Sequence, residues 1–452
     1  MSTSVVIGEG AYGCIHKPSL TCKEPKIQSY KNKVSKVLKK KMAAQEIGEY
    51  AIIAKADKTH EYYLGNPIDC SVANTPTNIE AIQKCKTGKE LLKNLDDLSL
   101  LVMEDGGINL KDYADAMGKW PATQKYIEKM ENILLEFHRI LRGIGVFLEN
   151  DILHFDMKPQ NIVYSDVNNR MNIIDFGLTV SFKDIMKRAK TNTNRMAMYH
   201  WSYPFEFHFL NKYTYEQFAK LSTKDKEEYY KSIIQGINKN DDEAATKAIT
   251  GFYSFIFDNN IGSADFKQYM TGFYQTLLSE ITPNNFQTFA KTSMHSVDVY
   301  GTGIALLYLL KKTHHLLPEK LHKDLYELGK NMVSAQLSKR DTAEGVLMNY
   351  ETILTEHGIM KKHNVYFTNH KIEKGELLPK HIEQSIESIK MEDIILNENA
   401  LAKNAVTADI TGIKKNPPRK TRKPRKNNPA SATLSKTSKS LTKKNKRTKN
   451  VL

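Results

Sequence analysis

The sequence predicts an α+β fold in which a β-rich amino-terminal part is followed by a helical carboxyl-terminal part. Short apolar, β-prone runs gather towards the amino terminus, at 5–7, 14–16, 34–38 and 100–103. Helix-like runs prevail later in the chain, and the apolar run 304–310 suits a buried helix segment. With 452 residues and 40% apolar content, the chain can bury a large core.

The first β-prone run leads into Gly8-Glu9-Gly10-Ala11-Tyr12-Gly13. A G-x-G-x-x-G pattern lets backbone amides approach phosphates closely, so Gly8, Gly10 and Gly13 are candidate nucleotide contacts. The same pattern could open a dinucleotide-binding helix, which would need an acidic residue about twenty positions later. The chain offers lysines there instead, and Cys14-Ile15-His16 continues as a strand. A glycine hairpin is therefore preferred.

A second strand and a helix follow the glycines. Residues 34–38 alternate as a strand, with Lys36 on the same face as Val34. Residues 42–56 are predicted to form a helix, with Ile47, Ala51 and Ala54 spaced as its apolar face.

Polar side chains flank a predicted hairpin in the middle of the chain. Residues 162–164 and 171–174 are β-prone and are separated by a polar segment suited to a turn. Asp156 and Asn161 precede the first strand, and Asp175 follows the second. A hairpin brings these ends together. Carboxylate and carbonyl oxygens are ligands that Mg²⁺ prefers, so the sequence predicts a magnesium site here.

The run His154-Phe155-Asp156-Met157-Lys158-Pro159-Gln160-Asn161, followed by Asp175-Phe176-Gly177, resembles the catalytic loop and D-F-G signature of eukaryotic-type serine/threonine protein kinases. The resemblance implies a bilobal protein kinase fold, with a β-rich N-lobe and a helical C-lobe. It implies that ATP and Mg²⁺ are used to phosphorylate Ser or Thr hydroxyls of proteins. His154 is expected to be a structural, hydrogen-bonded residue.

The resemblance also implies roles for single residues. Asp156 would accept the substrate hydroxyl proton, and Lys158 would neutralise the γ-phosphate. Metal binding would fall to Asn161 and Asp175.

The nucleotide-binding residues are implied in the same way. Lys36 would clamp the α- and β-phosphates, and Glu104 would begin the segment whose backbone binds adenine. Glu49 is the preferred helix partner of Lys36, with Glu46, one turn earlier, as the alternative.

Three further positions resemble scaffold residues of the family. Glu206, in Tyr203-Pro204-Phe205-Glu206, would close the activation segment and form a buried ion pair with Arg340. Tyr203 stands where the family has alanine. Asp298 would brace the catalytic loop.

One departure lies within the catalytic loop itself. Phe155 replaces an arginine that, in most members, pairs with a phosphorylated activation-loop residue. An aromatic ring cannot form a charge-assisted pair with phosphate. We therefore expect activity not to depend on activation-loop phosphorylation through this contact.

These expectations divide the chain into several parts. They are an N-lobe at 1–104, a C-lobe at 105–360 with a helical insert at about 207–290, an extension at 361–410, and a disordered basic tail at 411–452.

The tail carries the charge imbalance of the protein. Residues 414–452 contain fifteen Lys and Arg without Asp or Glu, which equals the formal net charge of +15. Such a segment cannot bury enough apolar surface to fold alone. It could bind nucleic acid, an acidic protein or an anionic membrane without sequence specificity, or serve as a nuclear-localisation signal. A third possibility is that the tail is solvated and has no binding role.

Composition sets expectations about location. No apolar run reaches the roughly eighteen residues that span a bilayer, so no transmembrane segment is predicted. The residues Cys14, Cys22, Cys70 and Cys85 show no paired metal-ligand spacing, so we expect reduced thiols in an intracellular protein.

A narrower resemblance concerns the source. The glycine motif, the catalytic loop and the long insert together look like the divergent kinases of large nucleocytoplasmic DNA viruses. This implies a location in the host cytoplasm or in the virion, and the basic tail would suit a packaged protein near DNA.

Two other functions are left open. One is a catalytically silent kinase-fold scaffold that binds nucleic acid or proteins through its insert and tail. The other is a small-molecule kinase, against which Lys158-Pro159 and the P-x-E end of the activation segment argue.

Overall fold

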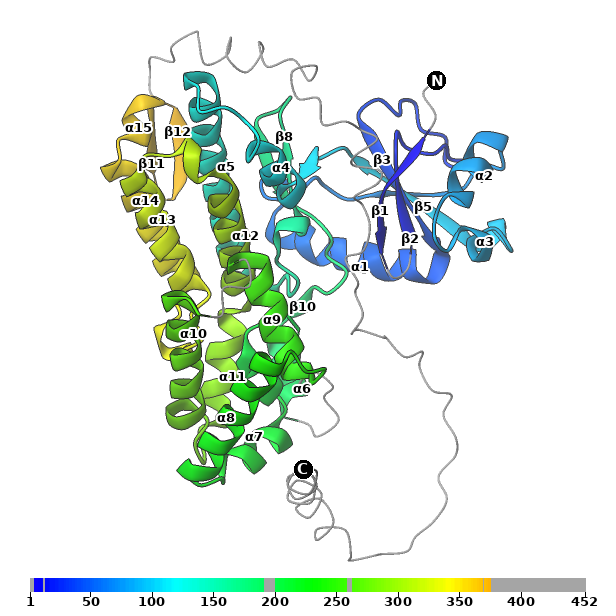
Figure 1. The fold of residues 1–452 in the computed structure, drawn as a ribbon. Coiled ribbons are helices and arrows are strands. Elements are labelled where there is room, and N and C mark those ends of the chain that lie inside the picture. Colours follow the sequence, from blue (N-terminus) through cyan, green and yellow to red (C-terminus); the bar gives the residue numbers. More distant parts are fainter. Residues whose placement is uncertain (1–3, 11–12, 191–199, 258–261, 369, 375–452) are drawn as a thin grey trace, which may run out of the picture. The chain divides into compact units, whose positions relative to one another are not determined.

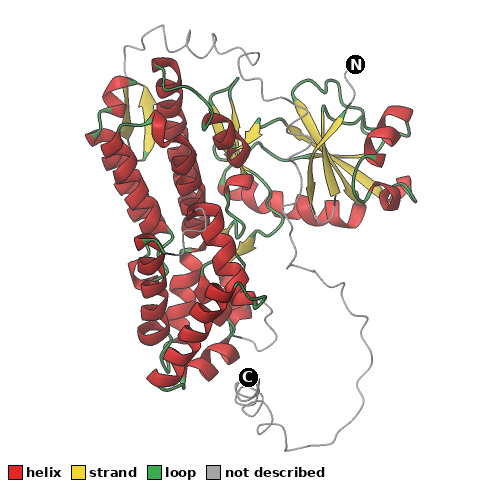
Figure 2. Cartoon of the chain, in the orientation of Figure 1, coloured by secondary structure: helices red, strands yellow, loops and turns green. Residues whose placement is uncertain are grey.

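The computed structural model describes residues 4–10, 13–190, 200–257, 262–368 and 370–374, all within one compact unit. It is a mixed α/β structure with a sheet in the amino-terminal region (Figure 1). Helices form the majority of the remainder (Figure 2). This architecture is compatible with a protein kinase fold. The predicted tail at 411–452 and residues 375–410 of the predicted extension lie outside the described residues.

The amino-terminal sheet has five antiparallel strands in the order β1-β2-β3-β5-β4. Their bounds are β1 (Val5–Gly10), β2 (Gly13–Lys17), β3 (Lys33–Lys39), β4 (Ile68–Ser71) and β5 (Leu98–Glu104). One face buries Val37, Leu100 and Val102, as the alternation of β-branched and aliphatic residues requires. The predicted strands are confirmed, and β1 extends through the first two glycines of the motif.

Three helices accompany this sheet, namely α1 (Lys40–Ala56), α2 (Pro76–Gln83) and α3 (Gly88–Leu91). The predicted helix at 42–56 is confirmed, but its predicted face is correct only in part: Ile47 and Ala54 are half-buried against the core, and other residues form the buried stripe. The buried residues of α1 are Ala43, Glu46, Tyr50 and Ile53, whereas Ala51 is exposed. Helix α1 packs against β3 and β5 through this stripe, which mixes a carboxylate and a phenol with two aliphatic groups. The spacing of apolar residues alone therefore does not identify the buried stripe.

The cysteines are joined in two disulfides, which contradicts the expectation of reduced thiols. Cys14 of β2 is bonded to Cys85, and Cys22 is bonded to Cys70 of β4. The partners are 71 and 48 positions apart, so no short spacing could have revealed them. The cellular location of the protein stays a prediction.

We expect the disulfide between Cys22 and Cys70 to contribute about 2–4 kcal/mol to the free energy of unfolding, because it restricts the unfolded chain. The double variant Cys22→Ala/Cys70→Ala should unfold at correspondingly lower urea concentration than the wild type. The connectivity itself can be read by alkylating the denatured protein without reductant and measuring its mass. Alkylation of all four cysteines under these conditions would contradict both bonds.

The predicted hairpin belongs to one of two small sheets in this part of the chain. Strands β8 (Ile162–Ser165) and β9 (Arg170–Ile173) pair antiparallel, as predicted, and β6 (Ile108–Asn109) pairs with β8. Strands β7 (Ile152–Leu153) and β10 (Val180–Ser181) form a second short ladder. The segment between β7 and β8 is therefore held by a ladder at each end.

The main helices of the carboxyl-terminal region share one hydrophobic core. Their bounds are α4 (Leu110–Met117), α5 (Gln124–Glu149), α6 (Phe182–Ala189), α11 (Phe286–His295), α12 (Val297–Thr313), α13 (Glu319–Met332), α14 (Ala343–Glu356) and α15 (Ile359–Lys362). Helix α12 lies centrally, because it contacts α4, α5, α13 and, in the predicted insert, α9 (Ala244–Phe257). The predicted buried segment 304–310 lies within it. In the described part of the chain, none of the helices combines the length and apolar character required to traverse a membrane.

The predicted insert is helical. Its elements are a 3₁₀ turn (Phe205–Phe209), α7 (Lys212–Ala219), α8 (Thr223–Lys239), α9 (Ala244–Phe257), α10 (Ala264–Gln275) and a π-helical turn (Thr276–Glu280). The side chains of Asn211, Ser222 and Ser263 accept hydrogen bonds from backbone N–H groups at the helix starts. Tyr269 of the insert shares a 2.9 Å hydroxyl–hydroxyl hydrogen bond with Tyr300 of α12. The insert therefore belongs to the common core.

A last hairpin follows α15, at the start of the predicted extension. It consists of β11 (Val365–Thr368) and β12 (Lys371–Lys374). Just before β11, the buried His363 contacts Glu131 of α5 at 2.8 Å. His370, in the turn, contacts Glu351 of α14 at 3.0 Å. The beginning of the extension is thus attached to the helical core, which the sequence did not indicate.

Candidate active site

The segment between β7 and β8 is anchored from helix α12. The carboxylate of Asp298, near the start of α12, accepts the backbone N–H groups of His154 at 2.7 Å and Phe155 at 2.8 Å. Burial raises the pKa of Asp298, an effect opposed by His154 and by these two N–H donors. His154 is buried, and its ring lies 2.9 Å from the carbonyl oxygen of Ile174. The scaffold roles predicted for Asp298 and His154 are confirmed.

Glycine is required where α12 meets this segment. A Cβ atom on Gly301 would lie 2.2 Å from the carbonyl oxygen of Met157. That is far inside van der Waals contact, so the helix can approach only without a side chain at this position. Asp298 and Gly301 thus fix the backbone on either side of Asp156.

Three of the predicted site residues lie within hydrogen-bonding distance of one another. The Nζ atom of Lys158 lies 2.8 Å from Oδ2 of Asp156. The amide nitrogen of Asn161 donates to the same oxygen at 3.0 Å and to the backbone carbonyl of Asp156 at 2.7 Å. Asp156 is therefore oriented by two neighbours, one of them a cation.

Asp175 lies at the end of the same hairpin. The preceding residue, Ile174, donates its N–H to the carbonyl of Asn161 at 3.0 Å, which holds Asp175 near the start of β8. Desolvation by the surrounding protein acts to raise the pKa of Asp175. The positive charges of Lys36 and then Lys158 outweigh this effect and hold the pKa below its ordinary value. The side chain still has exposed surface. An accessible carboxylate whose ionised form is favoured by two lysines suits the binding of a cation that carries phosphate.

Phe176, directly after Asp175, is buried in an aromatic cluster. Its ring centroid lies 5.2 Å from that of Tyr50, 5.8 Å from Tyr63 and 5.3 Å from His154. The contacts with Tyr50 and Tyr63 are edge-on, an arrangement that is favourable for aromatic rings. Because Tyr50 belongs to α1, the cluster connects this helix to the segment that carries Asp156.

Lys36 pairs with Glu46 rather than with Glu49. The Nζ atom of Lys36 lies 2.7 Å and 2.9 Å from the two carboxylate oxygens of Glu46. Burial acts to lower the pKa of Lys36, but Asp175 and Glu46 outweigh it and raise the pKa. The preferred partner Glu49 instead accepts a hydrogen bond from Gln45 at 2.9 Å. Glu46 belongs to the buried stripe of α1, which is the signal that the sequence analysis missed.

The predicted glycines lie on β1 and β2 and at their junction. Gly8 pairs with Ile15, and Gly10 pairs with Gly13. A Cβ atom on Gly13 would lie 2.2 Å from the carbonyl oxygen of Val37. Gly13 is therefore required for β2 to pack beside β3. The tip of the motif, Ala11 and Tyr12, lies outside the described residues.

Glu104 is the last residue of β5, and its role at the start of an adenine-binding segment stays a prediction. Its side chain forms an ion pair with Lys33 of β3. The next residue, Asp105, donates its N–H to the carbonyl of Asn32 at 2.8 Å, and its carboxylate pairs with Lys17 at 2.9 Å. The segment after β5 is therefore fastened to the sheet by its side chains as well as its backbone.

Glu206 and Arg340 form the predicted buried ion pair. The guanidinium of Arg340 contacts both carboxylate oxygens of Glu206, at 2.5 Å and 3.2 Å. The side chains are 0% and 1% exposed, so the pair is removed from water. The prediction of this pair is confirmed.

A second group of possible metal ligands lies in the sheet region. Cys14, His16 and Cys85 are buried, and their ligand atoms lie within 4.8 Å of one another. The two sulfur atoms are bonded to each other, so they are not available to a metal ion in this form. We assign this cluster no role in the candidate active site.

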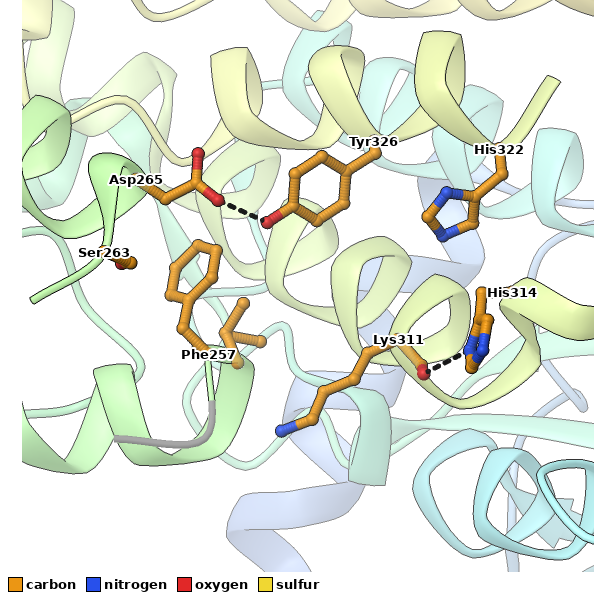
Figure 3. Close-up of a pocket in the computed structure, with 8 residues that line it drawn as sticks. Phe257, Ser263, Asp265, Lys311, His314, His322 and Tyr326 are labelled. Atoms are coloured by element: carbon orange, nitrogen blue, oxygen red, sulfur yellow. Dashed lines mark hydrogen bonds between the residues drawn. The ribbon is translucent and has the colours of Figure 1, made fainter. Parts of the chain in front are cut away.

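A cavity of about 340 Å³ lies near the insert (Figure 3). It is lined by Ile256, Phe257, Ser263, Asp265, Lys311, His314, His322 and Tyr326. Tyr326 donates a hydrogen bond to Asp265 at 2.9 Å. None of these lining residues belongs to the segment 154–161 or to the sheet. The cavity is therefore separate from the candidate active site.

Parts of the chain are similar to serine/threonine protein kinases. Yeast serine/threonine-protein kinase CAK1 (Saccharomyces cerevisiae) is 34% identical over 83 residues, which is 17% of this chain and 22% of that protein. Cyclin-dependent kinase 14 of Xenopus tropicalis is 31% identical over 96 residues, or 20% of this chain and 22% of that protein.

A third relative, from Dictyostelium discoideum, is named as a probable inactive serine/threonine-protein kinase, samkD. It is 27% identical over 168 residues, which is 36% of this chain and 28% of that protein. No family model matches the chain. The chain thus spans less than a third of the length of these relatives. Over short stretches, it is similar to protein kinases of the serine/threonine class.

Proposed function

We propose that the chain is a bilobal, ATP- and Mg²⁺-dependent protein kinase that phosphorylates Ser or Thr hydroxyls. The observation that carries this proposal is the convergence of Asp156, Lys158 and Asn161, with Asp175 close to the cations Lys158 and Lys36. Phosphoryl transfer needs a hydroxyl acceptor, cations for the spreading phosphate charge, and a metal site.

The donor set fits Mg²⁺. Asn161 and Asp175 provide amide and carboxylate oxygens, which are hard ligands of the kind this ion prefers. When bound there, the ion would neutralise negative charge on the phosphates. Lys36, held by Glu46, would contact the α- and β-phosphates of ATP.

The remaining residues act on the protein substrate. Asp156 accepts the proton of the attacking hydroxyl, since its carboxylate is already oriented by Lys158 and Asn161. Lys158, next to that carboxylate, lies where it can meet the charge of the transferred phosphoryl group. Backbone groups after Glu104 would bind adenine.

Incubation of the purified protein with labelled ATP, Mg²⁺ and a mixed set of acidic and basic proteins tests this proposal. Label on Ser or Thr is expected. ATP binding without any transfer would instead favour the silent scaffold, a possibility also raised by the name of the relative samkD. Transfer to a sugar or amine alone would favour a small-molecule kinase.

The structure makes Glu46 and Glu49 a matched pair of variants. We expect Glu46→Gln to lower kcat/KM for ATP about tenfold or more, because one charged partner of Lys36 is lost. Glu49→Gln, in the same helix and of the same chemistry, should change it much less. Steady-state kinetics with varied ATP measure both. A larger effect from Glu49→Gln would favour Glu49, the partner preferred from the sequence, over Glu46.

Further proposals concern the surroundings of the enzyme. We propose that residues 414–452 attract nucleic acid or an acidic partner, on the basis of their charge alone. The viral source, with location in the host cytoplasm and virion, likewise rests on the resemblance of the motifs. The relatives named above come from a yeast, a frog and a slime mould.

A further inference from the structure

Two departures from the kinase pattern touch each other in the fold. Phe155 replaces the usual arginine of the catalytic loop, and Tyr203 replaces the usual alanine at the end of the activation segment. They are 48 positions apart, yet their ring centroids are 5.5 Å apart. The Tyr203 hydroxyl donates a hydrogen bond to the Phe155 carbonyl oxygen at 2.8 Å. Phe207 stacks on Tyr203 at 5.2 Å and also contacts Phe155.

The contact is buried. Phe155 and Tyr203 are 6% and 5% exposed, and Phe207 is fully buried. A buried tyrosine hydroxyl needs a partner, because leaving it without a hydrogen bond costs free energy. Burial, reinforced by the charges of Asp156 and Asp298, raises the pKa of Tyr203 well above its ordinary value. The hydroxyl therefore stays protonated and remains a donor.

The Phe155 peptide is held from both sides. Its N–H donates to Asp298 at 2.8 Å, and its carbonyl accepts from Tyr203 at the same distance. Phe155 has a φ of 65°, in the left-handed region that a bulky residue rarely adopts. Such a conformation persists only where the surroundings impose it. The next residue is Asp156, so these two hydrogen bonds orient the backbone from which the side chain of the candidate base extends.

We propose that Tyr203 is a positioning residue, which fastens the activation segment to the catalytic loop through Phe155 and so orients Asp156 without a phosphate. This inference rests on the proposed function. It gives the arginine-to-phenylalanine replacement a physical consequence: an uncharged contact, built from a hydrogen bond and stacked rings, takes the place of a charge pair that depends on phosphorylation.

The first test is Tyr203→Phe, which keeps the ring and removes only the hydroxyl. The expected result is a fall in kcat of about tenfold, the size of one lost buried hydrogen bond, with KM for ATP unchanged. The matched control is Tyr350→Phe. Tyr350 is also buried and donates to a backbone carbonyl, that of Leu134, at 2.8 Å. The Tyr350→Phe variant should lose a similar free energy of unfolding but keep the kcat of the wild type.

A second measurement addresses phosphorylation. Wild-type protein treated with a protein phosphatase, and checked by mass for complete removal of phosphate, should keep its kcat within about twofold. A large loss that returns on rephosphorylation would overturn the inference, as would equal kcat values for Tyr203→Phe and Tyr350→Phe.

The two levels of the proposal can be told apart. An active wild type with an unaffected Tyr203→Phe variant would remove the role of Tyr203 and leave the kinase function standing. A wild type that binds ATP but transfers no phosphate would overturn the kinase function, and the role of Tyr203 with it.

Discussion

Replacing Asp156 with Asn should lower kcat for protein phosphorylation by about 10²–10⁴-fold, because the substrate hydroxyl would lose its proton acceptor. Asparagine keeps the shape of the side chain, and its oxygen can still accept from Lys158 and Asn161, which lie 2.8 Å and 3.0 Å from the present carboxylate. The local structure should therefore survive. Transfer of labelled phosphate at saturating ATP measures the loss.

Two controls make this result specific to the candidate base. Binding of ATP, measured by titration calorimetry, should change little in Asp156→Asn, because Lys36 and Asp175 are untouched. Asp96→Asn alters an exposed carboxylate in the short 3₁₀ turn Leu95–Asp97 and should leave kcat unchanged. Full activity in Asp156→Asn would remove Asp156 from the proposed mechanism.

Replacing Arg340 with Met should lower the free energy of unfolding by about 3–5 kcal/mol, since the change leaves the buried Glu206 carboxylate without its cation. The guanidinium also donates to the carbonyl oxygen of Ser334 at 2.7 Å and to the hydroxyl of Ser296 at 3.1 Å. These bonds would be lost too. Urea denaturation followed by circular dichroism gives the difference.

The control for this variant is an exposed ion pair. Lys84 and Glu80 lie one helical turn apart with exposed side chains, so Lys84→Met should cost well under about 1 kcal/mol. The double variant Arg340→Met/Glu206→Leu should recover much of the lost stability, because no unpaired charge stays buried. A stability of Arg340→Met equal to that of Lys84→Met would contradict the structural role of the pair.

Much of the local structure followed from short patterns. The strands at 5–7, 14–16, 34–38 and 100–103 and the hairpin 162–174 are formed by segments whose alternation and turn residues agree with the fold. The candidate site residues of the segment 154–161 could be located because they lie within eight positions of one another. Their hydrogen bonds follow from that closeness.

The errors concern contacts between distant segments. Ile47, Ala51 and Ala54 were predicted as the apolar face of α1, but only Ile47 and Ala54 are half-buried. The buried stripe contains Glu46 and Tyr50, whose polar groups contact Lys36 and Met103. A buried carboxylate or phenol carries no apolar signal in the sequence. Only the approach of β3 and β5 shows which side of the helix is covered.

The sequence by itself predicted several strands, the helix at 42–56 and the central hairpin, and it named candidate motifs for binding phosphate, a metal ion and a hydroxyl proton. Tertiary structure alone decided the pairing of four cysteines, the choice of Glu46 over Glu49, and the contact between Tyr203 and Phe155. The physical reason is that local patterns specify backbone conformation. The partner of a side chain depends on which distant segments the folded core brings within bonding distance.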